Sequence, residues 1–433
     1  MNYKNDPLVP RKLIIPFILV TLLFAMWGFA NSVTDPMVQA FKKVLELSNT
    51  QASWIQMAFY GGYFSMALPA AIFIRKYSYK SGILIGLLLY SFGALMFYPA
   101  ANTGEFWFFC VGLYILTFGL AFLETTANPY ILSMGSKTTA SRRLNLAQSF
   151  NPFGLLFGLF IAQQFVLKNL ESDDISNFEL LDESQRELIR NSDLLVIRDP
   201  YVYLGIFVLI VFVVFVITKM PKSKEEGSFN FNNTLKKLLN NKKYIFGVFA
   251  QLFYVGAQIM CWTFIYLFAE AINIDSANAA NFQFISFILF LIGRWFNTYL
   301  LKYFSSHFLL LFFSCFGILF VSITILNNNI IGLYSLVSLS FCMSLMFPTI
   351  YAISLEDLNK DDSKIGAAGL VMAIVGGALL PRFQAQIIDL GGSGVSDLNI
   401  LGLPEVNISF ILPLICFIYI AIYSKLIPKF NNS

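Results

Sequence analysis

The sequence predicts an all-α integral membrane protein with twelve transmembrane helices in two six-helix bundles. Of its 433 residues, 57% are hydrophobic and only 12% are charged, which is about half the charged fraction of a typical soluble protein. Its mean hydropathy is +0.68. The apolar residues gather into twelve runs, and one polar stretch divides these runs six and six. A soluble multidomain protein is therefore excluded.

Each apolar run is long enough to cross a hydrocarbon core of about 30 Å at about 1.5 Å per helical residue. The first run follows a polar N-terminus without a small-residue cleavage site, so we expect it to be retained as a span. The predicted spans are 13–41, 51–74, 81–101, 106–134, 140–167, 201–218, 244–271, 277–301, 308–326, 330–355, 366–388 and 406–427.

The stretch that divides the spans is polar, basic and rich in asparagine. It reads PKSKEEGSFNFNNTLKKLLNNKK at 221–243 and contains a short amphipathic pattern around 235–239. It predicts an N-terminal bundle at 1–219, a cytoplasmic linker at 220–242 and a C-terminal bundle at 243–433.

The basic residues indicate the orientation. An even number of spans puts both termini on one side, and most of the 29 basic residues then fall in segments on that side. Because short loops rich in Lys and Arg stay in the cytoplasm, we expect both termini to be cytoplasmic. The loop 168–200 on the other side is acidic.

Residues for catalysis or metal binding are scarce. His307 is the only histidine, and the five cysteines stand singly within apolar runs. Zinc chemistry and Ser/His/Asp hydrolysis therefore lack their ligands and bases. We expect no enzyme activity, no metal and no cofactor, and the expected partners are a small molecule, protons and the lipid bilayer rather than nucleic acid.

Glu124 is a carboxyl group near the middle of the run 106–134. An ionised side chain in the bilayer core costs from about 2.5 to more than 10 kcal/mol, so this carboxyl should face a cavity or be protonated. Asn128 lies four residues later on the same helix face, and Pro129 disturbs the backbone hydrogen bonds beside it. The alternatives for Glu124 are a proton-coupling site and a structural hydrogen bond or ion pair.

Further polar residues stand beside prolines in other spans. They are Asn31 and Asp35 before Pro36, and Gln148 and Asn151 before Pro152. Amides supply both donors and acceptors without a net charge, which suits an uncharged polyhydroxylated ligand. Asp35 lies at a different depth from Glu124, and two buried acids at different depths suit a proton path.

Two spans in corresponding positions carry similar stripes. Trp27, Asn31 and Asp35 recur at four-residue spacing in the first span, and Tyr254, Gln258 and Trp262 do so in the seventh. The stripes indicate either a shared binding face or a coincidence in a chain rich in aromatics. Two arginines also lie within spans. We expect Arg294 to pack or snorkel, and leave Arg382 open between ligand contact and structure.

Five segments carry a resemblance to a known family. They are WGFAN at 27–31 with Asp35, FYGGYF at 59–64, LETTANP at 123–129, RLNLAQSFN at 143–151 and YVGAQ at 254–258. The chain resembles, essentially end to end, the fucose/galactose/glucose:proton symporter family of the major facilitator superfamily. Two six-helix halves are also typical of that superfamily.

The resemblance implies a proton-coupled symporter that imports a monosaccharide across the bacterial cytoplasmic (inner) membrane by alternating access. It implies that Asp35 and Glu124 are the protonatable carboxylates, and that Phe290 is an aromatic sugar contact. The expected sugar is L-fucose, with galactose, glucose or N-acetylglucosamine as alternatives, because Phe347 stands where the fucose transporters have a tyrosine. The expected sugar contacts are Asn31, Glu124, Asn128, Gln148, Asn151, Gln258, Trp262 and Phe290.

Two other functions fit the sequence less well than symport does. An uncoupled sugar facilitator or sensor would need neither Asp35 nor Glu124, and a membrane-embedded enzyme lacks a catalytic cluster. Superfamily members usually work as monomers, so a monomer is expected.

Overall fold

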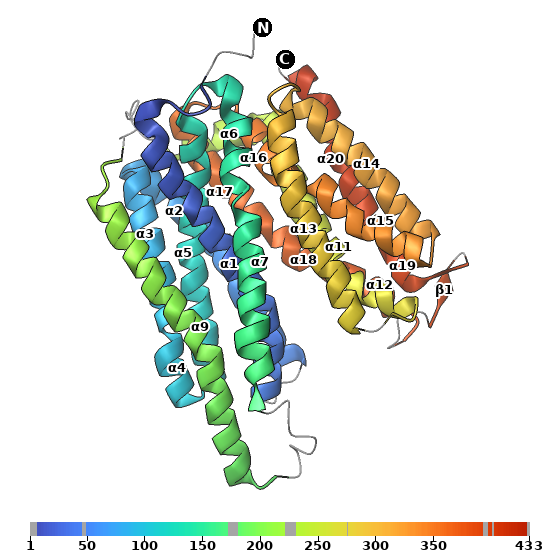
Figure 1. The fold of residues 1–433 in the computed structure, drawn as a ribbon. Helices are drawn as coiled ribbons and strands as arrows, with labels where there is room; N and C mark the ends of the chain where they lie inside the picture. The colour runs from blue at the N-terminus through green and yellow to red at the C-terminus, as the bar shows by residue number, and fades with distance from the viewer. Residues whose placement is uncertain are drawn as a thin grey trace. The chain divides into compact units, whose positions relative to one another are not determined.

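The computed structural model describes residues 7–45, 49–171, 181–220, 231–274, 276–392, 397–400 and 402–430. The helices through the first half, traced in Figure 1, are α1 (Ile14–Val44), α2 (Asn49–Lys76), α3 (Tyr79–Leu95), α4 (Phe97–Thr103), α5 (Phe106–Ser133), α6 (Ala140–Gln148), α7 (Asn151–Ile161) and α9 (Glu183–Ile217). The helices that follow are α10 (Phe231–Asn240), α11 (Lys242–Thr263), α12 (Ile265–Ala271), α13 (Ser276–Leu300), α14 (Ser306–Leu326), α15 (Ile330–Met343), α16 (Met346–Leu355), α17 (Lys360–Met372), α18 (Gly376–Ile388), α19 (Glu405–Ser409) and α20 (Ile411–Phe430).

Short elements join these helices. They are the helical turns η1 (Arg11–Leu13), η2 (Lys137–Thr139), η3 (Ala162–Val166), η4 (Leu167–Asn169) and η6 (Ala373–Val375), and the antiparallel strands β1 (Asn399–Ile400) and β2 (Leu403–Pro404).

Twelve helical stretches among the described residues are long and apolar enough to cross a membrane, which confirms the predicted all-α class and the twelve spans. The short amphipathic helix predicted before the seventh span is present as α10. One helix is longer than expected, because α9 begins at Glu183, well before the predicted start at 201. Asp182 caps it by accepting from the Gln185 amide, so the helix continues into the segment predicted to be an outer loop.

The chain forms two compact units. The α1 unit contains residues 12–130 and 150–225, and the α11 unit contains residues 1–11, 131–149 and 226–433. The last turn of α5 and all of α6 therefore belong with the α11 unit. The predicted division into 1–219, 220–242 and 243–433 stays a prediction.

In the α1 unit, α1 packs along α7 and α3 packs along α9. The α1–α7 contact depends on small residues. A Cβ added to Gly28 would lie 2.0 Å from the Asn151 carbonyl oxygen, and one added to Gly154 would lie 1.8 Å from that of Ala25. Only hydrogen at these positions lets the two backbones approach so closely. Gly154 therefore serves the packing of α7 against α1.

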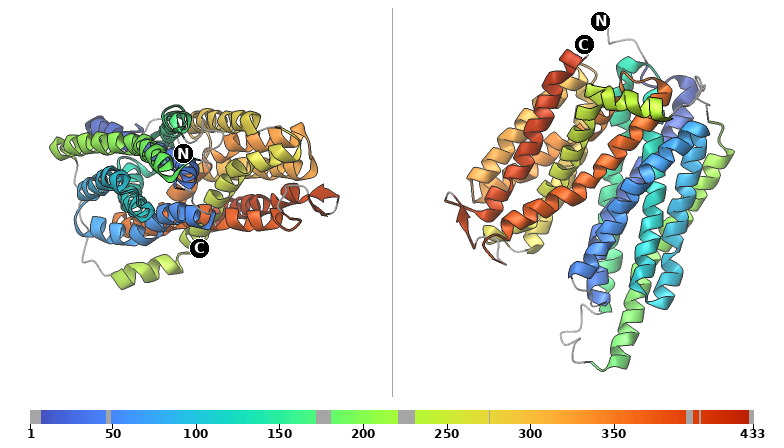
Figure 2. Two further views of the ribbon diagram at one scale, coloured as in Figure 1. Left: turned by 90° about the horizontal axis from the view of Figure 1, so that it is seen from below. Right: turned by 180° about the vertical axis from the view of Figure 1, so that it is seen from behind.

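In the α11 unit, α11 lies beside α16, α18 and α20, and α14 packs against α15 and α20 (Figures 1 and 2). Three of its described spans are interrupted, and the twelfth breaks at Phe410 between α19 and α20. The tenth breaks between α15 and α16 at Ser344 and Leu345, and the eleventh breaks at η6. Pro348 follows the first break and has no N–H, so the Ser344 carbonyl lacks its usual helical donor.

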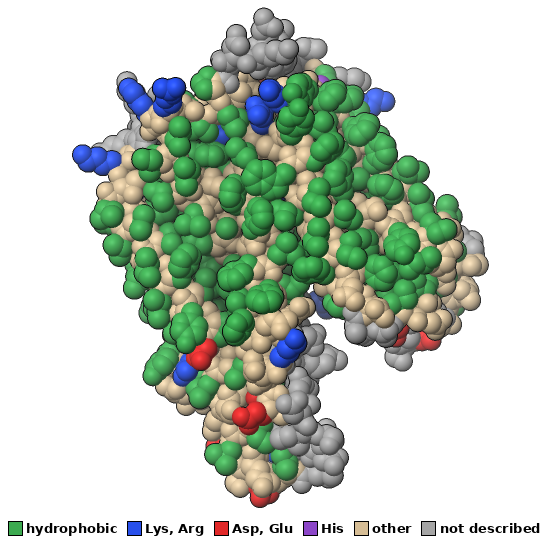
Figure 3. All heavy atoms as spheres, viewed as in Figure 1, with side chains coloured by type: hydrophobic (Ala, Val, Ile, Leu, Met, Phe, Trp, Pro, Cys, Tyr) green, Lys and Arg blue, Asp and Glu red, His purple; other side chains and the backbone are tan. Residues whose placement is uncertain are grey.

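Apolar side chains cover the outer faces of the helices. Hydrophobic atoms dominate the visible sides in Figure 3, whereas Lys, Arg, Asp and Glu gather at helix ends. On α14, exposed Phe308, Phe312 and Phe316 follow one another at four-residue spacing. These faces fit a lipid environment, in which exposed hydrophobic surface costs nothing.

Candidate functional site

One turn of α1 is held by two other helices of the α1 unit. The Asn151 side chain on α7 donates from Nδ2 to the Phe24 carbonyl at 3.2 Å, and the Tyr90 hydroxyl on α3 donates to the Met26 carbonyl at 3.0 Å. Both bonds go to the α1 backbone. This part of α1 is therefore fixed in depth and rotation.

Trp27, in the same turn, joins α1 to α2. Its indole Nε1 donates to the Tyr63 hydroxyl at 2.7 Å, and both side chains are buried. Tyr63 in turn interacts electrostatically with Glu124 on α5. Within the α1 unit, the Tyr63 phenol on α2 is thus linked to the Trp27 indole on α1 by a hydrogen bond and to the Glu124 carboxyl group on α5 by an electrostatic interaction.

Glu124 is 1% exposed, and its Oε2 atom has no hydrogen-bond partner among the described residues. It forms no ion pair with any residue that the structure describes. The Asn128 Nδ2 atom donates to the Glu124 backbone carbonyl at 3.1 Å rather than to the carboxyl group. Because an unpaired carboxylate is costly to bury, this site suits a carboxyl group that takes up and releases a proton.

The other polar residues predicted in the α1 unit differ in their surroundings. The Oδ1 atom of Asn31 is buried without a hydrogen-bond partner in the described part of the chain, so it can accept one from a ligand. Asn151 is already engaged by α1, as described above. Asp35 lies in α1, but its side chain is outside the described part of the structure.

The α11 unit contains a second polar cluster, centred on Arg294. Arg294 is 3% exposed, and its Nη1 atom donates to Oε1 of Gln148 on α6 at 3.2 Å. The guanidinium carbon lies 4.9 Å from the Phe290 ring centroid, a cation–π distance. No carboxylate of the described residues pairs with Arg294, and its Nε atom has no acceptor there. The structure thus brings the predicted residues Gln148 and Phe290 together around a buried cation.

Aromatic rings form one wall of this cluster. Trp262 meets Phe290 edge-on at 5.1 Å between ring centroids, and its Nε1 atom donates to the Ser340 hydroxyl at 3.0 Å. Tyr254 interacts electrostatically with Arg294, and its hydroxyl is buried without a hydrogen-bond partner in the described residues. Gln258, between them on α11, is partly exposed. Such rings can cover the C–H faces of a sugar.

Sequence reasoning missed several residues that the structure places at these sites. Tyr63 belongs to the FYGGYF segment at 59–64 but was not predicted as a site residue, although its hydroxyl accepts from Trp27 and interacts electrostatically with Glu124. Gln251 on α11 is fully buried, and neither polar atom of its side chain has a hydrogen-bond partner in the described chain. The sequence signal for Gln251 was an amide side chain about one turn before Tyr254 in a mostly apolar segment.

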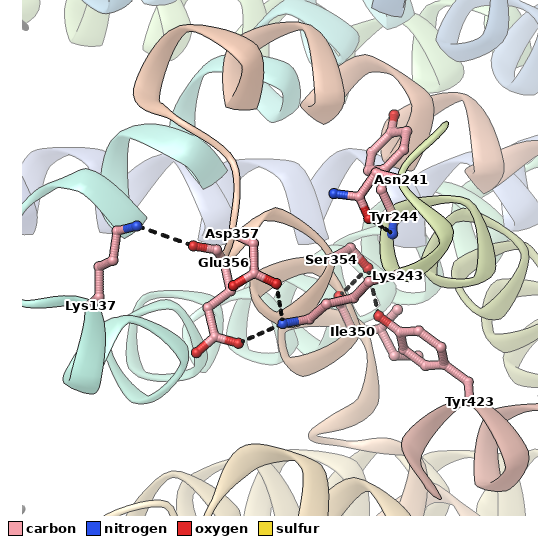
Figure 4. A network of polar contacts seen from close by, with 9 residues as sticks. All are labelled: Lys137, Asn241, Lys243, Tyr244, Ile350, Ser354, Glu356, Asp357 and Tyr423. Atoms are coloured by element: carbon pink, nitrogen blue, oxygen red, sulfur yellow. Dashed lines mark hydrogen bonds and ion pairs between the residues drawn. The ribbon is translucent and has the colours of Figure 1, made fainter. Parts of the chain in front are cut away.

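A separate ionic network lies where α11 begins and α16 ends (Figure 4). The nearly buried Lys243 ammonium contacts Glu356 at 3.0 Å and Asp357 at 2.8 Å, and Lys137 donates to the Glu356 carbonyl at 3.3 Å. The carboxylates satisfy the buried lysine, which gives this network a structural role.

The comparisons with known proteins give the family. A model of the Major Facilitator Superfamily matches residues 17–381. The chain belongs to this superfamily, in the branch that contains the L-fucose-proton symporters of Haemophilus influenzae and Escherichia coli. The first is 52% identical over 97% of this chain and 98% of its own length, and the second is 32% identical over 96% and 93%.

Solved structures agree with this assignment. A crystal structure of the major facilitator transporter FucP in the outward conformation matches with a TM-score of 0.86 and 33% identity, over 96% of this chain and 99% of that one. The resemblance found in the sequence is thereby confirmed. The protein is a multi-pass membrane transporter of the cytoplasmic membrane and not an enzyme.

Proposed function

We propose that this protein imports L-fucose together with protons. The observation that carries the proposal is Glu124, a fully buried carboxyl group in the middle of a membrane helix with an oxygen free of any described partner. The 52% identity to a protein named as an L-fucose-proton symporter supports both the sugar and the coupling. An uncoupled facilitator has no need of such a costly group.

In the proposed cycle Glu124 takes up a proton by way of Asp35. Its neutral form hydrogen-bonds the sugar, and inward opening then releases sugar and proton together. The proposed sugar contacts are Asn31, Glu124, Asn128, Gln148, Asn151, Gln258, Trp262 and Phe290.

The transport cycle would proceed by alternating access of two six-helix bundles, at 1–219 and 243–433, joined by the linker at 220–242. We propose that the monomer is the working unit, as is usual in this superfamily.

Sugar counterflow in membrane vesicles tests the function. Vesicles loaded with unlabelled L-fucose should take up external labelled L-fucose transiently, and control vesicles without the protein should not. Failure of exchange with every sugar tried would contradict transport. Exchange that galactose, glucose or N-acetylglucosamine inhibits, but L-fucose does not, would replace the proposed substrate with one of these.

Both termini are proposed to be cytoplasmic, and single cysteines test this. The positions suggested by sequence alone, 172–177 and Ser223, lie outside the described residues. Glu187 on α9 and Lys236 on α10 are exposed in the structure. In a Cys315→Ser background, which removes the exposed native cysteine, Glu187→Cys should react with an impermeant thiol reagent in intact cells. Lys236→Cys should react only after permeabilisation, and the reverse pattern would overturn the orientation.

Arg294→Lys should reduce L-fucose exchange about tenfold or more. Lysine keeps the charge, but its compact ammonium cannot lie flat on Phe290 while donating to Gln148. Losing a hydrogen bond to a charged group is worth about 1.5–3 kcal/mol, and about 1.4 kcal/mol is a factor of ten. Arg382→Lys is the matched control, because Arg382 is exposed. If the two variants exchange L-fucose at equal rates, Arg294 only packs against its neighbours and has no role in sugar binding.

A further inference from the structure

The hydrogen bond between Trp27 and Tyr63 has a fixed direction. An indole N–H can only donate, so Trp27 occupies an acceptor lone pair on the Tyr63 oxygen. The phenolic hydrogen of Tyr63 remains available, and no acceptor for it is present among the described residues. Because Tyr63 is 2% exposed, water does not supply that acceptor freely.

An unmatched acceptor lies on α5, which packs closely against α2 beside Tyr63, since a Cβ added to Gly62 would lie 2.7 Å from the Thr117 Cβ atom. Glu124 Oε2 is buried and lacks a hydrogen-bond donor within the described chain. Buried donors and acceptors are rarely left unpaired in folded proteins. Here one orphaned donor and one orphaned acceptor belong to residues of the same unit that already interact electrostatically.

Among the described residues, the other titratable groups that act on Tyr63 are also phenols. Tyr60 on α2 and Tyr90 on α3 interact electrostatically with Tyr63, and Tyr90 already donates to the Met26 carbonyl. No lysine or arginine in the described part of the α1 unit forms an ion pair with Glu124. A hydroxyl group is therefore what this environment can offer to an ionised Glu124.

We propose that Tyr63 is a positioning residue for proton coupling, whose hydroxyl donates to the ionised Glu124 carboxylate after the proton has left. This inference rests on the proposed proton-coupled function. An O–H···O⁻ bond of this kind is charge-assisted and roughly twice as strong as a neutral one. When Glu124 is protonated the bond weakens, which frees the carboxyl group to bond the sugar.

The direction of these two hydrogen bonds also limits where the proton can travel. Trp27 donates to Tyr63 and Tyr63 donates to Glu124, so each hydrogen is directed toward the carboxylate. The indole nitrogen has no lone pair with which to accept a proton from Tyr63. The Trp27–Tyr63 pair therefore cannot relay protons to Glu124 or away from it. Protons reach and leave Glu124 by another route.

Tyr63→Phe removes the donor while keeping the ring. In a counterflow assay over a pH series, the variant should retain exchange within about threefold of wild type at acidic pH. The alkaline pH at which exchange declines should move upward by about one unit, because an ionised Glu124 without its donor is less stable than the neutral form that binds sugar. Trp27→Phe should move the decline in the same direction by a smaller amount.

Tyr90→Phe is the matched control. Tyr90 is an equally buried phenol that holds the same turn of α1, but its hydroxyl bonds a backbone carbonyl. This variant should lower the thermal stability and leave the pH profile of exchange unchanged. If Tyr63→Phe lowers stability but has the wild-type profile, Tyr63 is only structural and the inference is wrong. Absence of exchange in the wild type would instead refute the proposed function.

Discussion

Replacing Glu124 by glutamine should abolish the accumulation of L-fucose driven by a pH gradient while preserving sugar exchange. Glutamine has nearly the same shape and can still hydrogen-bond the sugar, but it fixes the neutral state and carries no exchangeable charge. A gradient of one pH unit is worth about 1.4 kcal/mol, enough for about tenfold accumulation with one proton per sugar. Wild type should approach that ratio, and Glu124→Gln should remain near one.

Two further variants complete this experiment. Glu124→Ala should lose exchange as well as accumulation, since it removes the proposed sugar contact. Glu405→Gln is the matched control, because Glu405 is also fully buried but accepts from the backbone amides of Asp397 and Leu398 at 2.7 Å each. It should retain accumulation. If Glu124→Gln still concentrates L-fucose with a normal proton signal, the coupling role passes to Asp35 alone.

The second large effect concerns the contact between α1 and α7. Gly154→Ala places a methyl group 1.8 Å from the Ala25 carbonyl oxygen, where no atom fits without moving a backbone. Overpacking of this kind typically costs about 1–3 kcal/mol and displaces the helices. We expect the melting temperature in detergent to fall by several degrees and uptake to fall with it. Gly154→Leu should leave little folded protein.

Gly61 provides the control for this prediction. It is also a helical glycine of the α1 unit, but a Cβ there would have its nearest contact at 3.9 Å, with the Tyr114 ring. Gly61→Ala should therefore be neutral or slightly stabilising, because alanine is the better helix former. Equal melting temperatures for Gly154→Ala and Gly61→Ala would contradict the close approach of α1 and α7.

The spans could be predicted because hydrophobic length alone determines them. An apolar run of sufficient length must be helical in a bilayer, where every backbone group needs an internal partner. The burial of Glu124 followed for the same reason. The breaks within the tenth and eleventh spans were harder to predict, because the apolar sequence continues across each break. Only Pro348 indicates one of the two.

The partners of the site residues could not be predicted. Gln148 and Arg294 are 146 positions apart, and no periodicity indicates that α6 places one against the other. Arg294 was expected to pack or snorkel because of its place in the span, whereas the structure gives it an amide, an aromatic ring and a free Nε atom. Tyr63 is one of 20 tyrosines, and the bond from Trp27 and the interaction with Glu124 distinguish it.

Sugar-driven proton movement tests the central claim most directly. Cells that express the protein, suspended without an energy source in lightly buffered medium, should alkalinise that medium when L-fucose is added. The signal should saturate with L-fucose concentration, disappear with a protonophore and be absent from cells that express Glu124→Gln. Entry of labelled L-fucose into the wild-type cells without any change in external pH would contradict proton symport.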